Sequence, residues 1–133
     1  MIKRTLGCLV VCGLIGAGTL QAHHSLAGVY DMKGDKSLTG SLEKLQFVNP
    51  HGSLTIKVKN ADGSAEDWVM TLGSATALAQ RGIGKTGPNA LHIGDMITVK
   101  FLPALNGGHL GFLKTVIMPD GRSIQISAAN PND

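Results

Sequence analysis

Apolar and polar residues alternate in short runs along most of this chain, and glycine, proline, asparagine and aspartate separate the runs. The alternation is clearest at 53–59, where Leu54, Ile56 and Val58 fall on one face and threonine and lysine residues on the other. A period of two residues predicts a strand with one buried face. The pattern predicts strands at 37–48, 53–59, 68–72, 96–102, 110–118 and 123–126.

One segment departs from this period. Residues 75–80 are rich in alanine and leucine, follow Ser74, whose hydroxyl suits a helix N-cap, and end at Arg81-Gly82. They predict one short helix between the third and fourth strands. Three strands, a helix and two strands, with a short sixth strand after them, is the order of an OB-type barrel. We therefore predict a mainly β fold, a small OB-like barrel of five to six strands, with a β-sandwich or an open meander as the alternative.

The first 22 residues follow a different pattern. Lys3 and Arg4 precede an apolar run at 6–20, and Ala22 closes it with a small side chain. This order is typical of a secretory signal peptide, and the run is shorter than the roughly 20 residues that a membrane-spanning helix needs. We expect a periplasmic or secreted protein without a membrane span after cleavage; a retained N-terminal anchor is the alternative.

The remaining chain divides into three parts by composition. Residues 23–36 are polar and contain scattered glycines, which predicts an extended arm, residues 37–126 form the predicted barrel domain, and residues 127–133 form a polar tail. The full chain has 12 Lys and Arg against 9 Asp and Glu. Loss of residues 1–22 removes two of the basic residues and both cysteines, so a basic surface for nucleic acid and cysteine chemistry are excluded from the mature chain.

The motifs that could suggest an enzyme lack the structural context that such a function requires. Residues 82–87 match the letters of a dinucleotide-binding G-x-G-x-x-G, but they follow a helix and run into Pro88, so we interpret them as a loop. Glu66 and Asp67 are neighbours on a strand and point to opposite faces. The other aspartates lie in turn-like places, where a carboxylate commonly accepts a backbone N–H. We predict a binding protein rather than an enzyme, because no set of residues assembles catalytic roles.

The histidines carry the candidate chemistry. Cleavage after Ala22 makes His23 the first residue, whose α-amine and imidazole can chelate one metal ion. A further imidazole from His24 or His51 gives an all-nitrogen set that suits Cu²⁺. Cleavage after Gln21 instead places His24 third, where amine, two backbone amides and imidazole form a square-planar chelate for copper or nickel. We predict a copper site of His23, His24 and His51.

The other histidines and the aromatic residues receive simpler interpretations. His51 lies between Pro50 and Gly52, which can hold its imidazole in one orientation, and His109 is the alternative to it. His92, between two apolar residues, is predicted to pack inside. Trp68 and the phenylalanines are predicted to fill the core rather than to stack on bases.

An ordered set of motifs also resembles a known family. The motifs are Ala22-His23-His24-Ser25, Tyr30-Asp31, Phe47-Val48-Asn49-Pro50-His51, Leu78-Ala79-Gln80-Arg81-Gly82, Gly94-Asp95 and Asp120-Gly121-Arg122. They resemble a family of small exported bacterial proteins of unknown function that typically open with His-His-Ser and carry Asn-Pro-His. The resemblance implies a periplasmic OB-like domain without an established activity. The rival prediction is a structural or partner-binding module of the cell envelope that holds no metal; in either case we expect a monomer.

Overall fold

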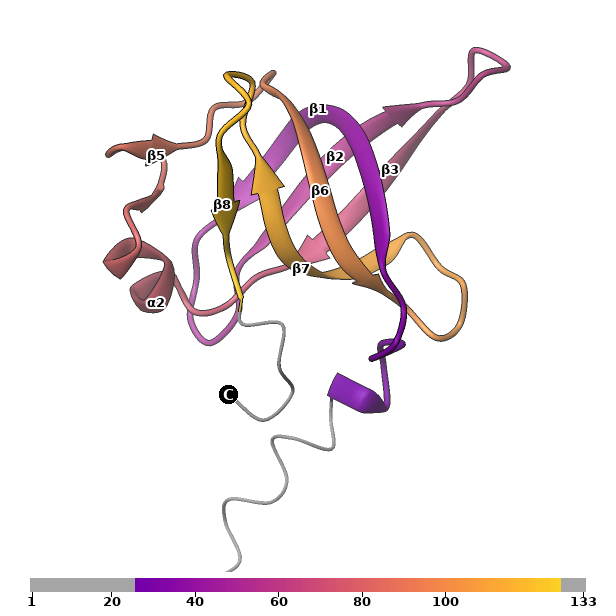
Figure 1. The fold of residues 1–133 in the computed structure, drawn as a ribbon, viewed down its shortest axis with the longest axis horizontal. Coiled ribbons are helices and arrows are strands. Elements are labelled where there is room, and N and C mark those ends of the chain that lie inside the picture. Colours follow the sequence, from indigo (N-terminus) through magenta and orange to yellow (C-terminus); the bar gives the residue numbers. More distant parts are fainter. Residues whose placement is uncertain (1–25, 128–133) are drawn as a thin grey trace, which may run out of the picture.

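The computed structural model describes residues 26–127, in which five strands close into a barrel and a sixth extends its sheet (Figure 1). The sheet order is β3-β2-β1-β6-β7-β8, and a parallel pairing of β3 with β7 closes the barrel. The strands are β1 (Lys36–Gln46), β2 (Ser53–Lys59), β3 (Ala65–Thr71), β6 (Met96–Pro103), β7 (Leu110–Ile117) and β8 (Ser123–Gln125). The predicted barrel is confirmed.

Helix α2 (Ala75–Gln80) lies between β3 and the fourth barrel strand, as predicted. The Ser74 side chain accepts the Ala77 N–H at 3.2 Å, which is the expected N-cap bond. Leu78 is the buried residue of this helix and joins the core. No helix within residues 26–127 is long and apolar enough to cross a membrane.

Strand β1 belongs to both halves of the barrel. Residues 36–41 pair with β6, and residues 41–46 pair with β2. Ser41 therefore has a paired residue on each neighbouring strand. The β1–β2 register shifts between Leu42 and Lys44. This bulge explains why Leu42 and Leu45, three residues apart, are both buried although a regular strand would put them on opposite faces.

The barrel interior is filled by aliphatic side chains around one aromatic ring. Phe101 is fully buried, and Trp68 packs against it at the edge of the core with ring centroids 5.6 Å apart. Gly111 on β7 lies directly under the Phe101 ring, where a methyl group would clash with ring atoms. The predicted core role of Phe101 and Trp68 is therefore confirmed.

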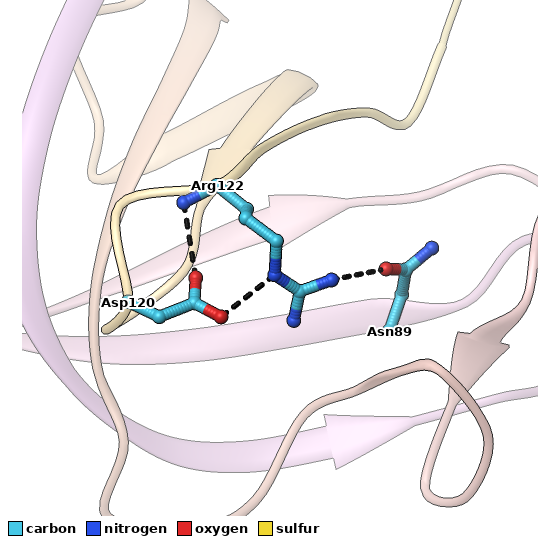
Figure 2. Close-up of polar contacts among 3 residues, drawn as sticks. All are labelled: Asn89, Asp120 and Arg122. Atoms are coloured by element: carbon cyan, nitrogen blue, oxygen red, sulfur yellow. Dashed lines mark hydrogen bonds and ion pairs between the residues drawn. The ribbon is translucent and has the colours of Figure 1, made fainter.

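The glycine-rich loop after α2 is tied to the barrel rather than loosely attached. Strands β4 (Ile83–Gly84) and β5 (Asn89–Ala90) pair with each other, and Ile83 is buried. Arg122 follows the turn after β7, and its guanidinium donates to the Asn89 side chain at 3.1 Å and to Asp120 at 2.6 Å (Figure 2). The interpretation as a loop misses these two short strands, because pairs this short leave no period in the sequence.

The predicted extended arm is wrong for its described part. The Leu26 carbonyl accepts the N–H groups of Val29 and Tyr30, which forms one helical turn. Tyr30 then bridges to Ala104, and the Leu105 N–H donates to the Val29 carbonyl at 2.9 Å. The segment before β1 is therefore bound to the β6–β7 side of the barrel.

Candidate functional site

His51 lies in the turn between β1 and β2, at the end of the barrel where β3 also ends. The Gly52 N–H donates to the Gly73 carbonyl at 3.1 Å, and the Gly52 carbonyl accepts the Leu72 N–H at 2.9 Å. A Cβ on residue 52 would lie 2.6 Å from the Gln46 carbonyl oxygen, so this close approach requires glycine. The backbone next to His51 is therefore fixed, while the His51 side chain is exposed.

A hollow of about 230 Å³ opens beside His51. Mainly apolar side chains line it, and they come from the segment before β1, from the end of β3 and from β7. The lining residues are Leu26, Val29, Tyr30, His51, Thr71, Leu72 and Phe112. The first described residue of the chain thus shares a hollow with His51.

Tyr30 anchors the segment that leads into this hollow. Its hydroxyl lies 2.9 Å from Thr71 Oγ1, and the Thr71 hydroxyl donates to the Gly111 carbonyl at 3.3 Å. The Tyr30 ring packs against Phe112 with centroids 5.7 Å apart, and only 6% of Tyr30 is exposed. These contacts join the N-terminal segment to both strands that close the barrel.

The structure brings the predicted ligand His51 to this hollow, whereas His23 and His24 lie outside the described residues. The alternative ligand His109 lies elsewhere. Its ring stacks on Trp68 with centroids 4.5 Å apart, and its Nε2 lies 3.5 Å from the Glu66 carboxylate. His51 precedes Gly52, which is bonded to Gly73 beyond the far end of β3, so His51 and His109 lie at different parts of the barrel.

The prediction that His92 packs inside is wrong. Its side chain is 68% exposed and lies 3.6 Å from the Asp95 carboxylate. Asp95 also accepts the His92 N–H at 2.9 Å, which closes the turn before β6. The neighbouring Leu91 occupies the buried position instead.

Metal-ligating side chains are not clustered in the described part of the chain. Within residues 26–127, no three His, Cys, Asp or Glu side chains are grouped closely enough to hold a metal ion. A metal centre that includes His51 would therefore need further donors from residues outside 26–127.

Two carboxylates have a lowered pKa, and both lie in hairpin turns away from the hollow. Hydrogen bonds from the Ser64 hydroxyl and N–H lower the pKa of Asp62. The N–H of Arg122, and then its guanidinium, lower the pKa of Asp120. These shifts reflect turn geometry, so they assign no acid–base role to either group.

Comparison with known proteins places the chain in a family. The model of a family of unknown function, DUF6152, matches residues 11–113, which is most of the sequence. The chain belongs to this family. No curated protein and no solved structure matches it. DUF6152 carries no assigned activity, so function must be argued from the site itself.

Sequence reasoning missed the residues that build the hollow around His51. Tyr30 is a single aromatic residue in a polar stretch and carries no periodic signal. Its partner Thr71 is 41 residues away in the sequence. The one available signal was the presence of Tyr30-Asp31 among the motifs that carry the family resemblance.

Proposed function

We propose that the mature protein is an exported copper-binding protein. In this proposal the new N-terminal amine and the imidazoles of His23 and His24 bind Cu²⁺, and His51 completes the site. The observation that carries the proposal is that Leu26 and His51 line the same hollow. The leader pattern of residues 1–22 supports export, and export is what frees the amine of His23.

Covalent geometry supports the meeting of these groups. The Cα atoms of His24 and Leu26 are two residues apart and can be separated by no more than about 7 Å. Tyr30 fixes the segment that begins at Leu26 on β3 and β7, and Leu26 lines the same hollow as His51. This tether supports the proposal that His23 and His24 reach the His51 imidazole.

The chemistry of the donor set favours copper. An N-terminal α-amine has an ordinary pKa near 8, so protons compete only weakly for this nitrogen at neutral pH. Nitrogen donors in a tetragonal arrangement suit Cu²⁺ better than the hard oxygen-seeking ions. Cleavage after Gln21 would keep a nitrogen-rich chelate ending at His24, and His51 would then be an additional ligand.

A partner-binding module is the second candidate, and one observation favours it. Val29 and Leu105 are 45% and 59% exposed, and a backbone hydrogen bond joins them. Two neighbouring exposed apolar side chains near the hollow offer a small contact for another protein. This candidate needs no metal affinity, which separates it from the first.

The substitution His51→Ala tests the copper proposal in a chain that begins at His23. Removal of one imidazole ligand should weaken Cu²⁺ binding by about tenfold or more. Affinity is measured by titration against a competing chelator of known affinity. The matched control is His92→Ala, because His92 is also exposed to solvent but lies before β6.

Equal copper affinity in the parent, His51→Ala and His92→Ala proteins would remove His51 from the site. Weak binding by all three proteins would favour the partner-binding module instead. A loss confined to His51→Ala is the result that the proposal predicts.

A further inference from the structure

A cleft opens at the end of the β1–β2 pairing that is away from His51, where β1 separates from β2. Pairing between these strands ends at Ser41 and Lys57, because β1 continues alongside β6 while β2 runs on into the β2–β3 hairpin (Figure 1). Beyond this point Lys59 pairs with Ala65 of β3 and has no paired residue on β1. The hairpin extends past the barrel and forms one wall of the cleft.

Glycine makes this separation possible. A Cβ on Gly40 would lie 2.5 Å from the Lys57 carbonyl oxygen, so only glycine lets β1 cross so close to β2 before it turns away. The resulting cleft has a volume of about 430 Å³. Its lining residues are Thr39, Gly40, Ser41, Glu43, Lys57, Lys59 and Met96.

Strand β2 supplies ammonium groups and a backbone N–H to the cleft. Lys57 and Lys59 are two residues apart on β2, so both ammonium groups lie on one face of the sheet. The Asn60 N–H donates to Ser64 across the hairpin, and the alternation of an antiparallel ladder therefore directs the Lys59 N–H toward the β1 side. The strand positions thus supply two positive charges and a backbone donor.

Hydroxyl groups complete the donor set. Thr39 Oγ1 lies 2.7 Å from Thr98 Oγ1, so one hydroxyl donates to the other and the accepting hydroxyl keeps its own proton available. Ser41 adds a second hydroxyl to the cleft wall. Such a set of ammonium, hydroxyl and amide donors is suited to an anion with several acceptor oxygens.

One acidic group opposes an anion in the cleft. The Glu43 carboxylate lies 3.8 Å from Lys57 Nζ, and both side chains are largely exposed. Within residues 26–127, Lys59 forms no ion pair of this kind. Glu43, together with Asp67 opposite Lys57 on β3, therefore offsets the charge of Lys57, whereas Lys59 lies opposite the uncharged Ala65.

We propose that this cleft binds a phosphate group, carried either by a small phosphorylated compound or by a phospholipid headgroup. Lysine binds phosphate as a point charge, and the tetrahedral group offers enough oxygens to accept from both strands. This site is independent of the copper proposal, since none of its residues lines the hollow beside His51.

An NMR titration of ¹⁵N-labelled protein with inorganic phosphate, at constant ionic strength with chloride as the reference anion, tests the proposal. Saturable shifts are expected at the amides of Ser41, Lys57 and Lys59. Lys59→Ala should weaken binding by a few-fold, up to about fivefold, as expected for an exposed charge pair. Glu43→Gln should tighten binding by a similar factor, because it removes the opposing charge.

The control substitution is Lys85→Ala, which removes an exposed lysine from the loop between β4 and β5. It should leave phosphate binding unchanged. The proposal is overturned if phosphate causes no more shift than chloride, or if Lys85→Ala weakens binding as much as Lys59→Ala.

Vesicle sedimentation then separates the two sources of phosphate. Retention on phosphatidylglycerol vesicles, lost in Lys59→Ala, would identify a headgroup. No retention by a protein that binds inorganic phosphate would identify a small phosphorylated compound.

Discussion

Carboxylates at the turns of this protein bind the backbone that follows or precedes them. Asp31 accepts the Lys33 N–H at 3.0 Å, and Asp120 accepts the Arg122 N–H at the same distance. An aspartate in such a turn offers the chain an acceptor that the strands cannot supply. At the scale of single residues, these contacts explain why Asp recurs at turns beside Gly and Lys.

Asp120→Asn should therefore make stability depend less on pH. Arg122 lowers the pKa of Asp120 in the folded protein, so ionised Asp120 stabilises the fold above its ordinary value of 3.8, and this contribution is lost as pH falls through the lowered pKa. We expect Asp120→Asn to be less stable than the parent at pH 7, with a difference that shrinks progressively below about pH 4.

Urea unfolding at pH 7 and in acid measures this difference. Asp67→Asn is the control, because the exposed Asp67 side chain receives no hydrogen bond from any residue of 26–127. A deficit for Asp120→Asn that stays constant across the pH range would contradict the argument.

Individual strands and the helix were predictable from the sequence because each one produces a local pattern of apolar and polar residues. The predicted bounds of β2 and α2 agree with the structure, and β1 differs mainly at its end. The three-residue spacing of Leu42 and Leu45 reflects the bulge in β1. Which neighbouring strand pairs with the bulged residues depends on long-range pairing. Periodicity therefore defines elements, whereas pairing and bulges depend on packing between distant segments.

Part of the candidate site was predictable for the same reason. The sequence Asn49-Pro50-His51-Gly52 predicts a turn that carries His51, and the structure has His51 in that turn. The hollow beside it was not predictable, because Tyr30 reaches Thr71 and Phe112 across the barrel closure.

Strand β7 offers a direct test of packing at the scale of an element. Gly111→Ala should destabilise the protein by about 1–3 kcal/mol, since the added methyl group would overlap the fully buried Phe101 ring. Gly73→Ala is the matched control, because nothing lies within 4 Å of a Cβ at that position. Denaturant unfolding of both variants measures the effect; equal stabilities would contradict the packing described for β7.

The whole molecule is a small closed barrel that offers two separate candidate sites. At one end, the segment before β1 leads into a hollow beside His51, and elsewhere β1 and the β2–β3 hairpin separate around a cleft lined by two lysines. Barrel closure through β3 and β7 creates the first site, because Tyr30 packs on these two strands. The second site lies where β1 stops pairing with β2 and continues alongside β6. Both sites therefore follow from the topology of the barrel rather than from added loops.

The most direct test of the copper proposal compares two proteins in a Cu²⁺ titration. One begins at His23, and the other carries three additional glycines before His23, so that neither His23 nor His24 becomes the third residue. The extension keeps every imidazole but moves the α-amine away from the His23 side chain. The proposal predicts tight one-to-one binding that is lost or strongly weakened on extension. Weak binding that the extension leaves unchanged would contradict it.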